Sequence, residues 1–240
     1  MRVTVHQPEF MPWLGFFHKA RMADVLVLLD DAQYRKNYFH NRNRIRTPDG
    51  WVWVTVPVEK NGIDTPMKDT RIASKNNPRW RDKIETAVRL SYGRAPFFDE
   101  TFAGMTHAMG GADDGMLTSL NVPLVRWLLE GFGLAEVDTV LSSSMHIETT
   151  ASQRILDICL QMGATTYVSG VSGMNYLDVG SFEKAGVAIE WQEFHHPIYQ
   201  QLHLQFQAQI SAVEALFLLG PEAHCLLRDD WPEKIDQVFA

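Results

Sequence analysis

The first 31 residues place two apolar runs around one turn-and-helix segment, and this arrangement restricts the fold more than any other part of the chain. Residues 2–5 (RVTV) and 25–31 (VLVLLDD) are rich in β-branched and apolar side chains, which is typical of strands buried on both faces. The spacing from Trp13 onward predicts a short helix between them. A strand, helix and strand within about 30 residues form a right-handed parallel unit. We therefore expect an α/β fold built on a parallel sheet.

The remainder of the chain continues this alternation of strands and helices. Residues 42–46 (RNRIR) and 51–58 (WVWVTVPV) predict a β-hairpin if TPDG forms the turn. Further strands are predicted at 137–144, from 166 into a Gly/Ser turn, and at 187–194, with helices at 80–93, 96–106, 114–134, 150–164 and 211–221. Residues 59–78 carry turn signals and predict a loop. Because no repeat or linker interrupts the pattern, we interpret 1–240 as one domain with a mostly helical insertion at about 79–134.

Charge and hydropathy exclude several classes of protein. Lys and Arg total 22 against 29 Asp and Glu, a formal net charge of −7, so binding to nucleic acid through bulk positive charge is not expected. No apolar run approaches the roughly 20 residues of a membrane span, and the N-terminus lacks the apolar core of a signal peptide. With only two cysteines, the sequence predicts a cytoplasmic protein without membrane insertion and leaves the oligomeric state open.

Polar side chains follow the first two predicted strands at the point where each ends. His6 and Gln7 follow the first strand, and Asp30 to Gln33 follow the second. Because ligands gather at the carboxyl ends of parallel strands, we expect these segments to be neighbours in one site. His6, His18 and Asp30 are the candidates for proton transfer, because histidine titrates near neutral pH and a carboxylate can orient it. The alternative is that the turn is shaped by its prolines and glycine, and that its histidines are satisfied locally.

The start of the predicted helix suits phosphate. Free N–H groups and the helix dipole favour an anion there, and Gly15 would permit close approach. We expect His18 and Lys19 to lie near this start and to contact the anion. In the hairpin, alternation puts Asn41 and Asn43 on one face and Arg42 and Arg44, with Arg46, on the other. Guanidinium groups in a row suit phosphate or carboxylate. The alternative is a solvated edge strand made cationic to prevent aggregation.

The remaining candidates are polar or aromatic residues predicted to line a cleft. Trp13, with Tyr34 or Tyr38, could stack on a base or sugar. The other candidates for substrate or phosphate binding are Gln7, Gln33, Ser169, Gly170, Tyr176, His196 and Tyr199. No set of ligands with metal-site spacing is present, so no protein-bound metal is predicted. The cofactor is left open, with ATP and magnesium allowed because Asp30 and Asp31 could hold a magnesium–nucleotide.

The opening segment also resembles nucleotidyltransferases, which carry an HxGH motif after their first strand and use both histidines on nucleotide phosphates. The resemblance implies a nucleotidyltransferase-like or HUP-like parallel core. The tetrad at the matching position is Trp13-Leu14-Gly15-Phe16, which has no histidine at either end. His6 and His18 would have to act in their place.

A longer resemblance covers nearly the whole chain. HQPEFMPWLGFFHKARMADVLVLLDDAQYRKNYFHNRNRIRTPDGWVWVTVPV, YVSGVSGMNYLD, FHHPIYQQ and SAVEALFLLGPEA resemble, in this order, the WbqC-like proteins. Members of that family are similar to proteins encoded among genes for bacterial surface polysaccharide. The resemblance implies an enzyme that attaches glycine or another small acyl group to the amine of a nucleotide-linked amino sugar. It supplies no catalytic residue.

Three functions therefore remain. The first is acyl or aminoacyl transfer, with Arg42 and Arg44 on the phosphates of a nucleotide-linked sugar or nucleotide and His6 or His18 as the base. The second is a nucleotidyltransferase or adenylate-forming enzyme. The third is a non-catalytic binding partner in polysaccharide assembly.

Overall fold

The computed structural model describes residues 1–60, 65–112, 114–203 and 205–231. Within these ranges five strands form a parallel sheet in the order β5–β2–β1–β6–β7. Their bounds are Arg2–His6 (β1), Val25–Leu28 (β2), Asp138–Leu141 (β5), Thr166–Ser169 (β6) and Ala188–Trp191 (β7). Numbered along the chain, the parallel strands take the order 3-2-1-4-5 of doubly wound sheets. The expected α/β class is confirmed.

Strand order fixes where the sheet changes direction. The chain runs outward from β1 through β2 to β5, and then returns to the other side of β1 as β6 and β7. The topological switch point therefore lies between β1 and β6. In sheets of this kind, ligands bind outside the carboxyl ends of the strands at that point.

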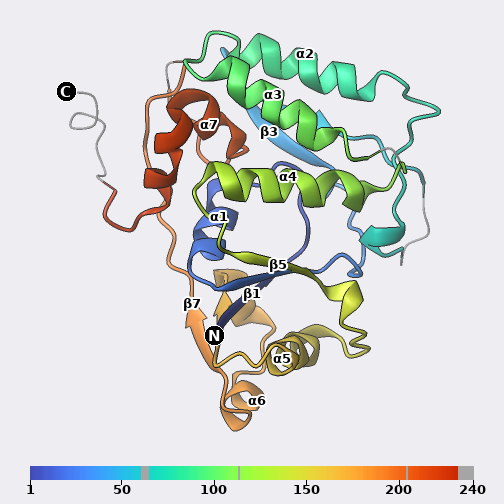
Figure 1. Ribbon diagram of the computed structural model, residues 1–240, viewed down its shortest axis with the longest axis vertical. Helices are drawn as coiled ribbons and strands as arrows, with labels where there is room; N and C mark the ends of the chain where they lie inside the picture. Colours follow the sequence, from blue (N-terminus) through green and yellow to red (C-terminus); the bar gives the residue numbers. More distant parts are fainter. Residues whose placement is uncertain (61–64, 113, 204, 232–240) are drawn as a thin grey trace.

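Helices cover both faces of the sheet (Figure 1). On one side lie α1 (Leu14–Arg21) and α4 (Leu117–Gly131), with α2 (Trp80–Tyr92) and α3 (Phe98–Met109) beyond α4. On the other side lie α5 (Ala151–Gln161) and α6 (Val179–Lys184), whereas α7 (Val213–Leu219) packs beside α3. Short 3-10 turns occupy Met67–Asp69, Ser142–Ser144, Val171–Asn175 and Gly220–Leu227 (η1 to η4).

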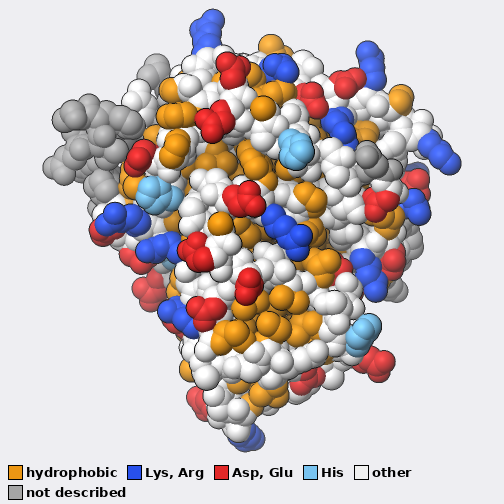
Figure 2. All heavy atoms as spheres, viewed as in Figure 1, with side chains coloured by type: hydrophobic (Ala, Val, Ile, Leu, Met, Phe, Trp, Pro, Cys, Tyr) orange, Lys and Arg blue, Asp and Glu red, His pale blue; other side chains and the backbone are white. Residues whose placement is uncertain are grey.

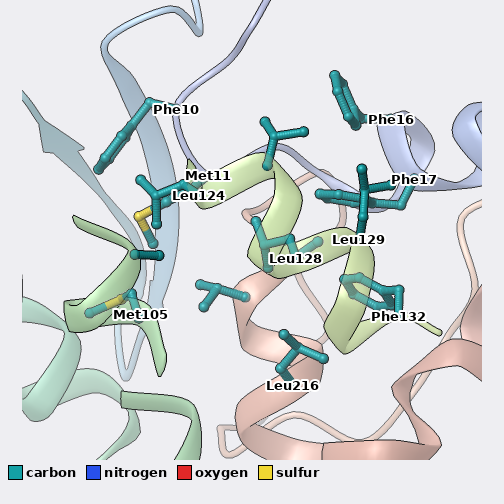
Figure 3. Packing of buried hydrophobic residues seen from close by; sticks show 14 of the residues in the cluster. Phe10, Met11, Phe16, Phe17, Met105, Leu124, Leu128, Leu129, Phe132 and Leu216 are labelled. Atoms are coloured by element: carbon teal, nitrogen blue, oxygen red, sulfur yellow. The ribbon is translucent and has the colours of Figure 1, made fainter. Parts of the chain in front are cut away.

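The alternation of buried side chains along β2 explains its apolar sequence. Val25 and Val27 belong to the core cluster beneath α5, and Leu26 and Leu28 belong to the larger cluster on the opposite face. Successive side chains of a strand point to opposite faces, so a strand covered on both sides is apolar throughout. Figure 3 shows the larger cluster, where Phe17 and Phe132 stack with ring centroids 5.1 Å apart.

The antiparallel hairpin is confirmed as β3 (Arg42–Thr47) and β4 (Gly50–Thr55). Thr47 pairs with Gly50, whose φ of 129° suits glycine at the end of the predicted TPDG turn. Several predicted strands are too long, because β2 ends at Leu28, before the two acids, and residues 142–144 form a 3-10 turn. The predicted loop at 59–78 includes η1, and its residues 61–64 lie outside the described residues.

Candidate functional site

Two cavities adjoin at the carboxyl ends of β1 and β6. The larger, here the main cleft, has a volume of about 730 Å³, and the smaller, here the side chamber, about 390 Å³. The two share five lining residues, namely His6, Lys19, Tyr38, Gly170 and Ser172. Both volumes fall in the range of roughly 300–1,000 Å³ found for small-molecule sites. The main cleft and side chamber therefore form one continuous candidate site at the switch point of the sheet.

The two polar segments predicted to be neighbours are neighbours. The Gln7 side chain donates from Nε2 to the Gln33 carbonyl at 3.3 Å, and both residues line the main cleft. Gln7 Oε1 accepts from His40 Nε2 at 2.9 Å, while His40 Nδ1 accepts from the Arg35 amide at 3.1 Å. These contacts fix the orientation of Gln7 at the end of β1.

His6 ends β1 at the boundary between the main cleft and side chamber. Its Nδ1 lies 3.0 Å from the Gln7 carbonyl, and because a carbonyl can only accept, Nδ1 carries the proton. Burial, and then the charge of Lys19, lowers the pKa of His6 to about 3. Its imidazole is therefore neutral at pH 7, and Nε2 is left as an unprotonated acceptor.

Lys19 reaches the site from an unexpected position. Lys19 and His18 lie in the last turn of α1 and not at its start. The prediction that these two residues contact a phosphate at the N-terminus of this helix is therefore wrong. Because helical side chains lean toward the helix N-terminus, the Lys19 side chain extends back toward β1, where its Nζ donates to the Val5 carbonyl at 3.0 Å. Burial lowers the pKa of Lys19 to about 8, and the nearby Glu9 partly opposes this effect.

Glu9 is a site residue that the sequence reasoning missed. It lines the side chamber with only 3% of its surface exposed. Burial raises its pKa to about 8, although the charge of Lys19 acts in the opposite direction. The available signal was its position in the HQPEF stretch, where a single acid stands between apolar residues.

Buried asparagines hold the loop that carries Glu9. Asn43 Nδ2 donates to the Met11 carbonyl at 2.7 Å and to the Phe10 carbonyl at 3.3 Å. Asn121, on α4, donates at 2.7 Å to the Pro8 carbonyl. Both asparagines are fully buried. Asn43 was predicted to bind substrate, but its carboxamide is engaged by backbone and positions the loop instead.

Asn41 has the same kind of structural role. Its Nδ2 donates to the Val56 carbonyl at 2.7 Å, and its Oδ1 accepts from the Tyr34 hydroxyl at 2.9 Å. The carboxamide lines neither the main cleft nor the side chamber.

The predicted row of three guanidinium groups does not form an anion site. Arg46 is buried and donates to backbone carbonyls, including that of Gln205 at 3.0 Å. Arg42 lies over the Trp53 ring at 4.2 Å and donates to the Asn37 carbonyl at 2.6 Å, outside both cavities. Arg44 does line the side chamber, where its Nη2 donates to the Gln209 carbonyl at 2.6 Å.

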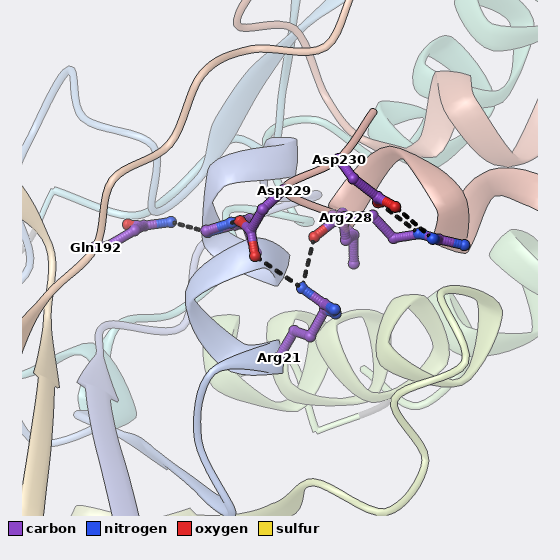
Figure 4. Close-up of polar contacts among 7 residues, drawn as sticks. Arg21, Gln192, Arg228, Asp229 and Asp230 are labelled. Atoms are coloured by element: carbon purple, nitrogen blue, oxygen red, sulfur yellow. Dashed lines mark hydrogen bonds and ion pairs between the residues drawn. The ribbon is translucent and has the colours of Figure 1, made fainter. Parts of the chain in front are cut away.

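His18 lies in a third cavity of about 480 Å³, apart from His6. Gln192 Nε2 donates to His18 Nδ1 at 3.0 Å, and His18 Nε2 donates to Asp229 Oδ1 at 2.9 Å. Arg21 also approaches the Asp229 carboxylate, at 3.7 Å (Figure 4). The geometry thus ties His18 to the C-terminal segment, so the two predicted catalytic histidines do not share a site.

Asp30 is placed away from the main cleft. Its carboxylate accepts from the Ser143 amide at 2.9 Å and the Ser143 hydroxyl at 2.6 Å, so it anchors η2. Asp31 does line the main cleft and forms an ion pair with Arg154 at 2.6 Å. Arg154 was not identified from the sequence, because only the tertiary fold brings α5 to this site.

Trp13, Gly15, Gly170 and Tyr176 all reach the candidate site. Trp13 and Gly15 line the side chamber, Tyr176 lines the main cleft, and Gly170 lines both. A Cβ on Gly15 would come within 2.5 Å of the Trp13 ring, so glycine permits this close packing.

Three other predicted site residues lie elsewhere. Ser169 is buried and donates to the Gly170 carbonyl at 3.1 Å. His196 lines the third cavity with His18. Tyr199 is buried, and its hydroxyl donates to Glu214 at 2.7 Å.

Neither the surface charge shown in Figure 2 nor the candidate metal ligands among the described residues mark the main cleft or the side chamber. Figure 2 shows basic and acidic side chains interspersed over the face that it displays. Among the described residues, one group could hold a metal ion by its mutual distances, namely Glu222, His224 and Cys225. None of these residues lines the main cleft or the side chamber. In the part of the chain that the structure describes, no helix has the length and apolar character needed to cross a membrane.

The fold and site define an α/β protein with a cleft at the switch point of a doubly wound sheet. The sequence profile of the WbqC-like protein family matches residues 7–225, and the chain belongs to this family. It is also similar to a Mycobacterium tuberculosis (strain ATCC 25618 / H37Rv) protein named "Uncharacterized protein Rv1507c", with 29% identity over 231 residues, 95% of this chain and 97% of the relative. No solved structure shows a significant match.

Proposed function

We propose that this protein is a cytoplasmic enzyme of bacterial surface-polysaccharide biosynthesis. It transfers glycine or another small acyl group to the amine of a nucleotide-linked amino sugar. The observation that carries the proposal is His6, which lines both the main cleft and the side chamber and has an unprotonated Nε2. We further propose that the parallel core is nucleotidyltransferase-like or HUP-like, because its strands take the 3-2-1-4-5 order.

The main cleft supports binding of the nucleotide part. Arg35, Arg154 and Lys19 bring positive charge to its walls, and Tyr38 and Tyr176 bring aromatic rings. Guanidinium groups suit the oxygens of a diphosphate, and aromatic rings suit a base or a sugar face. Asp31 neutralises part of the charge of Arg154 at 2.6 Å. A bound diphosphate would compete with Asp31 for that guanidinium.

The chemistry requires an acyl donor activated as a thioester or an acyl adenylate. The amine nitrogen attacks the acyl carbon, the C–N bond forms, and the thiolate or AMP leaves with the electron pair of the broken bond. The nitrogen must also lose a proton, and His6 Nε2 accepts it. Although burial keeps the pKa of His6 low in the free protein, the negative charge of a bound diphosphate would raise it.

A nucleotidyltransferase or adenylate-forming enzyme is the second candidate. It is favoured by the strand order and by Lys19, a buried amine that lines both cavities. It is disfavoured by the position of His18, which lies in the third cavity and so cannot act with His6 on one phosphate. This enzyme would release pyrophosphate from ATP or CTP without an amino sugar.

A thermal-shift panel tests the proposal with ATP, CTP, UDP-glucosamine and dTDP-linked amino sugars, each with and without magnesium. A ligand at 100 times its dissociation constant stabilises by about 2.7 kcal/mol, which corresponds to roughly 5–10 °C for a chain of this size. We expect the nucleotide-linked amino sugars to shift the midpoint. A shift with ATP or CTP alone would favour the second candidate, and no shift with any of them would favour a non-catalytic binding partner.

Turnover separates a catalytic role from a binding role. With an amino sugar that binds and glycyl or acetyl thioesters as donors, His6→Ala should reduce the rate roughly 10²–10⁴-fold. His107→Ala replaces an exposed histidine on α3 and serves as the matched control. Equal rates for the wild type and His6→Ala would refute the role of His6.

A further inference from the structure

The side chamber contains a carboxylate that the protein leaves without a partner. Glu9 lines this chamber, and its Oε2 atom is sealed from solvent with no hydrogen-bond partner among the described residues. Lys19 is close enough to affect its titration, yet within the described part of the chain the two side chains form no direct ion pair. Ionising a buried carboxyl group without partners costs several kcal/mol, and Glu9, with its pKa raised to about 8, therefore holds its proton at pH 7. A ligand that brought a positive charge and hydrogen-bond donors into the chamber would offset this cost.

The backbone of Glu9 is held in place. The carbonyls on either side of it, those of Pro8 and Phe10, accept from Asn121 at 2.7 Å and Asn43 at 3.3 Å. The Phe10 amide in turn donates to the Phe39 carbonyl at 2.9 Å. The loop is therefore fixed on both sides of Glu9, which is the condition for a preorganised binding group.

The walls of the side chamber indicate which ligand this carboxylate would take. Aromatic rings from Trp13, Phe16, Phe39 and Phe194 line it together with Glu9. A carboxylate among aromatic rings favours a cationic amine, which gains charge-assisted hydrogen bonds and cation–π contacts. The chamber is also deep enough in the fold to leave Glu9 almost without exposure.

Other titratable and charged groups face the same chamber and restrict the class of ligand that it can bind. Lys19 and Arg44 also line it, and so does the neutral imidazole of His6. Positive side chains beside Glu9 disfavour a ligand whose only charge is an ammonium. They favour a ligand with negative charge close to its amine, as in a nucleotide-linked amino sugar or an amino acid.

We propose that the side chamber is a primary-amine subsite, in which Glu9 accepts hydrogen bonds from the ammonium group of the substrate. This inference rests on the proposed function and adds the group that recognises the amine. An ammonium nitrogen has no lone pair, so it must lose one proton before it attacks and a second as the C–N bond forms. With a pKa of about 8, Glu9 holds a proton at pH 7 in the free protein, so it gives this proton to the neutral form of the entering amine and becomes the carboxylate that pairs with the ammonium. Glu9 takes the same proton back before the attack, and His6 Nε2 takes the second.

The test compares two ligands that differ only at the amine. UDP-glucosamine carries a free amine, and UDP-N-acetylglucosamine has the same amine acylated. Isothermal titration at pH 7 measures both dissociation constants for the wild type, Glu9→Gln and Glu193→Gln. Glu193 is an exposed carboxylate of the third cavity, so Glu193→Gln is the matched control for the change in charge. Glycine is the third ligand, because an amino acid is the other source of a primary amine beside an anion.

We expect the wild type and Glu193→Gln to bind UDP-glucosamine roughly 10–100-fold more tightly than UDP-N-acetylglucosamine. Glu9→Gln should bind the two equally, with its thermal midpoint measured without ligand to establish folding. Equal binding of both nucleotides by the wild type, without Glu9-dependent binding of glycine, would overturn the subsite while the proposed nucleotide-sugar function survives. Glu9-dependent binding of glycine alone would support the subsite but contradict the proposed sugar acceptor. Absence of Glu9-dependent binding for all three ligands would overturn the subsite.

Discussion

Asn121 is a fully buried residue of α4 that connects this helix to the two segments beside the main cleft. Its Nδ2 donates at 2.7 Å to the Pro8 carbonyl and at 2.7 Å to the His40 carbonyl. Its Oδ1 is buried without a partner. Replacement by leucine keeps a similar volume and removes both donors, so Asn121→Leu tests whether this carboxamide holds the loop in place.

The magnitude follows from the groups that lose or gain hydrogen bonds. Two buried carbonyls lose a donor, at about 1–3 kcal/mol each. The deletion of the unpartnered Oδ1 returns about 1–3 kcal/mol, and leucine has the higher helix propensity by about 0.5 kcal/mol. We expect Asn121→Leu to lower the free energy of unfolding by about 1–2 kcal/mol, or the midpoint by roughly 2–8 °C for a chain of this size.

Urea denaturation at pH 7 measures this loss, with Asn76→Leu as the control because Asn76 is exposed. The variant should also bind UDP-glucosamine more weakly, because Pro8 adjoins Glu9 and the loop would lose an anchor on that side. A loss of less than 0.5 kcal/mol, within the usual range for surface substitutions, would refute the reasoning. It would mean that water or a backbone shift satisfies both carbonyls.

Three further substitutions test other parts of the fold and site. Gly15→Ala places a Cβ within 2.5 Å of the Trp13 ring, so urea denaturation should show a loss of about 1–3 kcal/mol. Burial raises the pKa of Glu214 from 4.5 to about 7, so the stability tied to this group is complete below about pH 4.5 and is lost as pH rises through about 7. Thermal midpoints from pH 5 to 8 should therefore fall less for Glu214→Gln than for the wild type, and parallel curves would contradict this. Arg154→Met should weaken UDP binding roughly 10–100-fold in a titration, and unchanged affinity would show that the diphosphate lies away from the Asp31 pair.

Local pattern predicted much of the fold because the relevant signals lie close together in sequence. The strands before and after α1 are apolar on both faces, and TPDG provides a tight turn between the paired strands of the hairpin. Strand ends were predicted less well. No turn residue separates Leu29 and the two acids after it from the apolar run of β2, so the sequence does not mark the end of this strand. Pairing nevertheless stops at Leu28, because the neighbouring strands β1 and β5 end opposite it, at His6 and Leu141.

The candidate site was predicted in part. His6 and Gln33 line the same cleft. This could be predicted from the sequence, because parallel strands end at the same edge of a sheet. The roles of Asn43 and Arg46 were not, because alternation along a strand assigns a face but does not say whether that face meets solvent or backbone carbonyls. His18 was misplaced for a similar reason. The partner that holds it, Asp229, is 211 residues away.

The distribution of titratable groups favours a ligand site over a structural ion pair. Burial shifts Glu9, Lys19 and His6 each toward its neutral form. A fold that needed these groups only for stability would bring Glu9 and Lys19 into contact, because a buried pair without contact retains the desolvation cost and gains little attraction. Instead Lys19 donates to the Val5 carbonyl and Glu9 faces the side chamber. Buried titratable groups without partners are typical of sites where a bound ligand supplies the missing contacts. The side chamber, which all three residues line, lies at the switch point of the sheet, where the topology predicts a ligand.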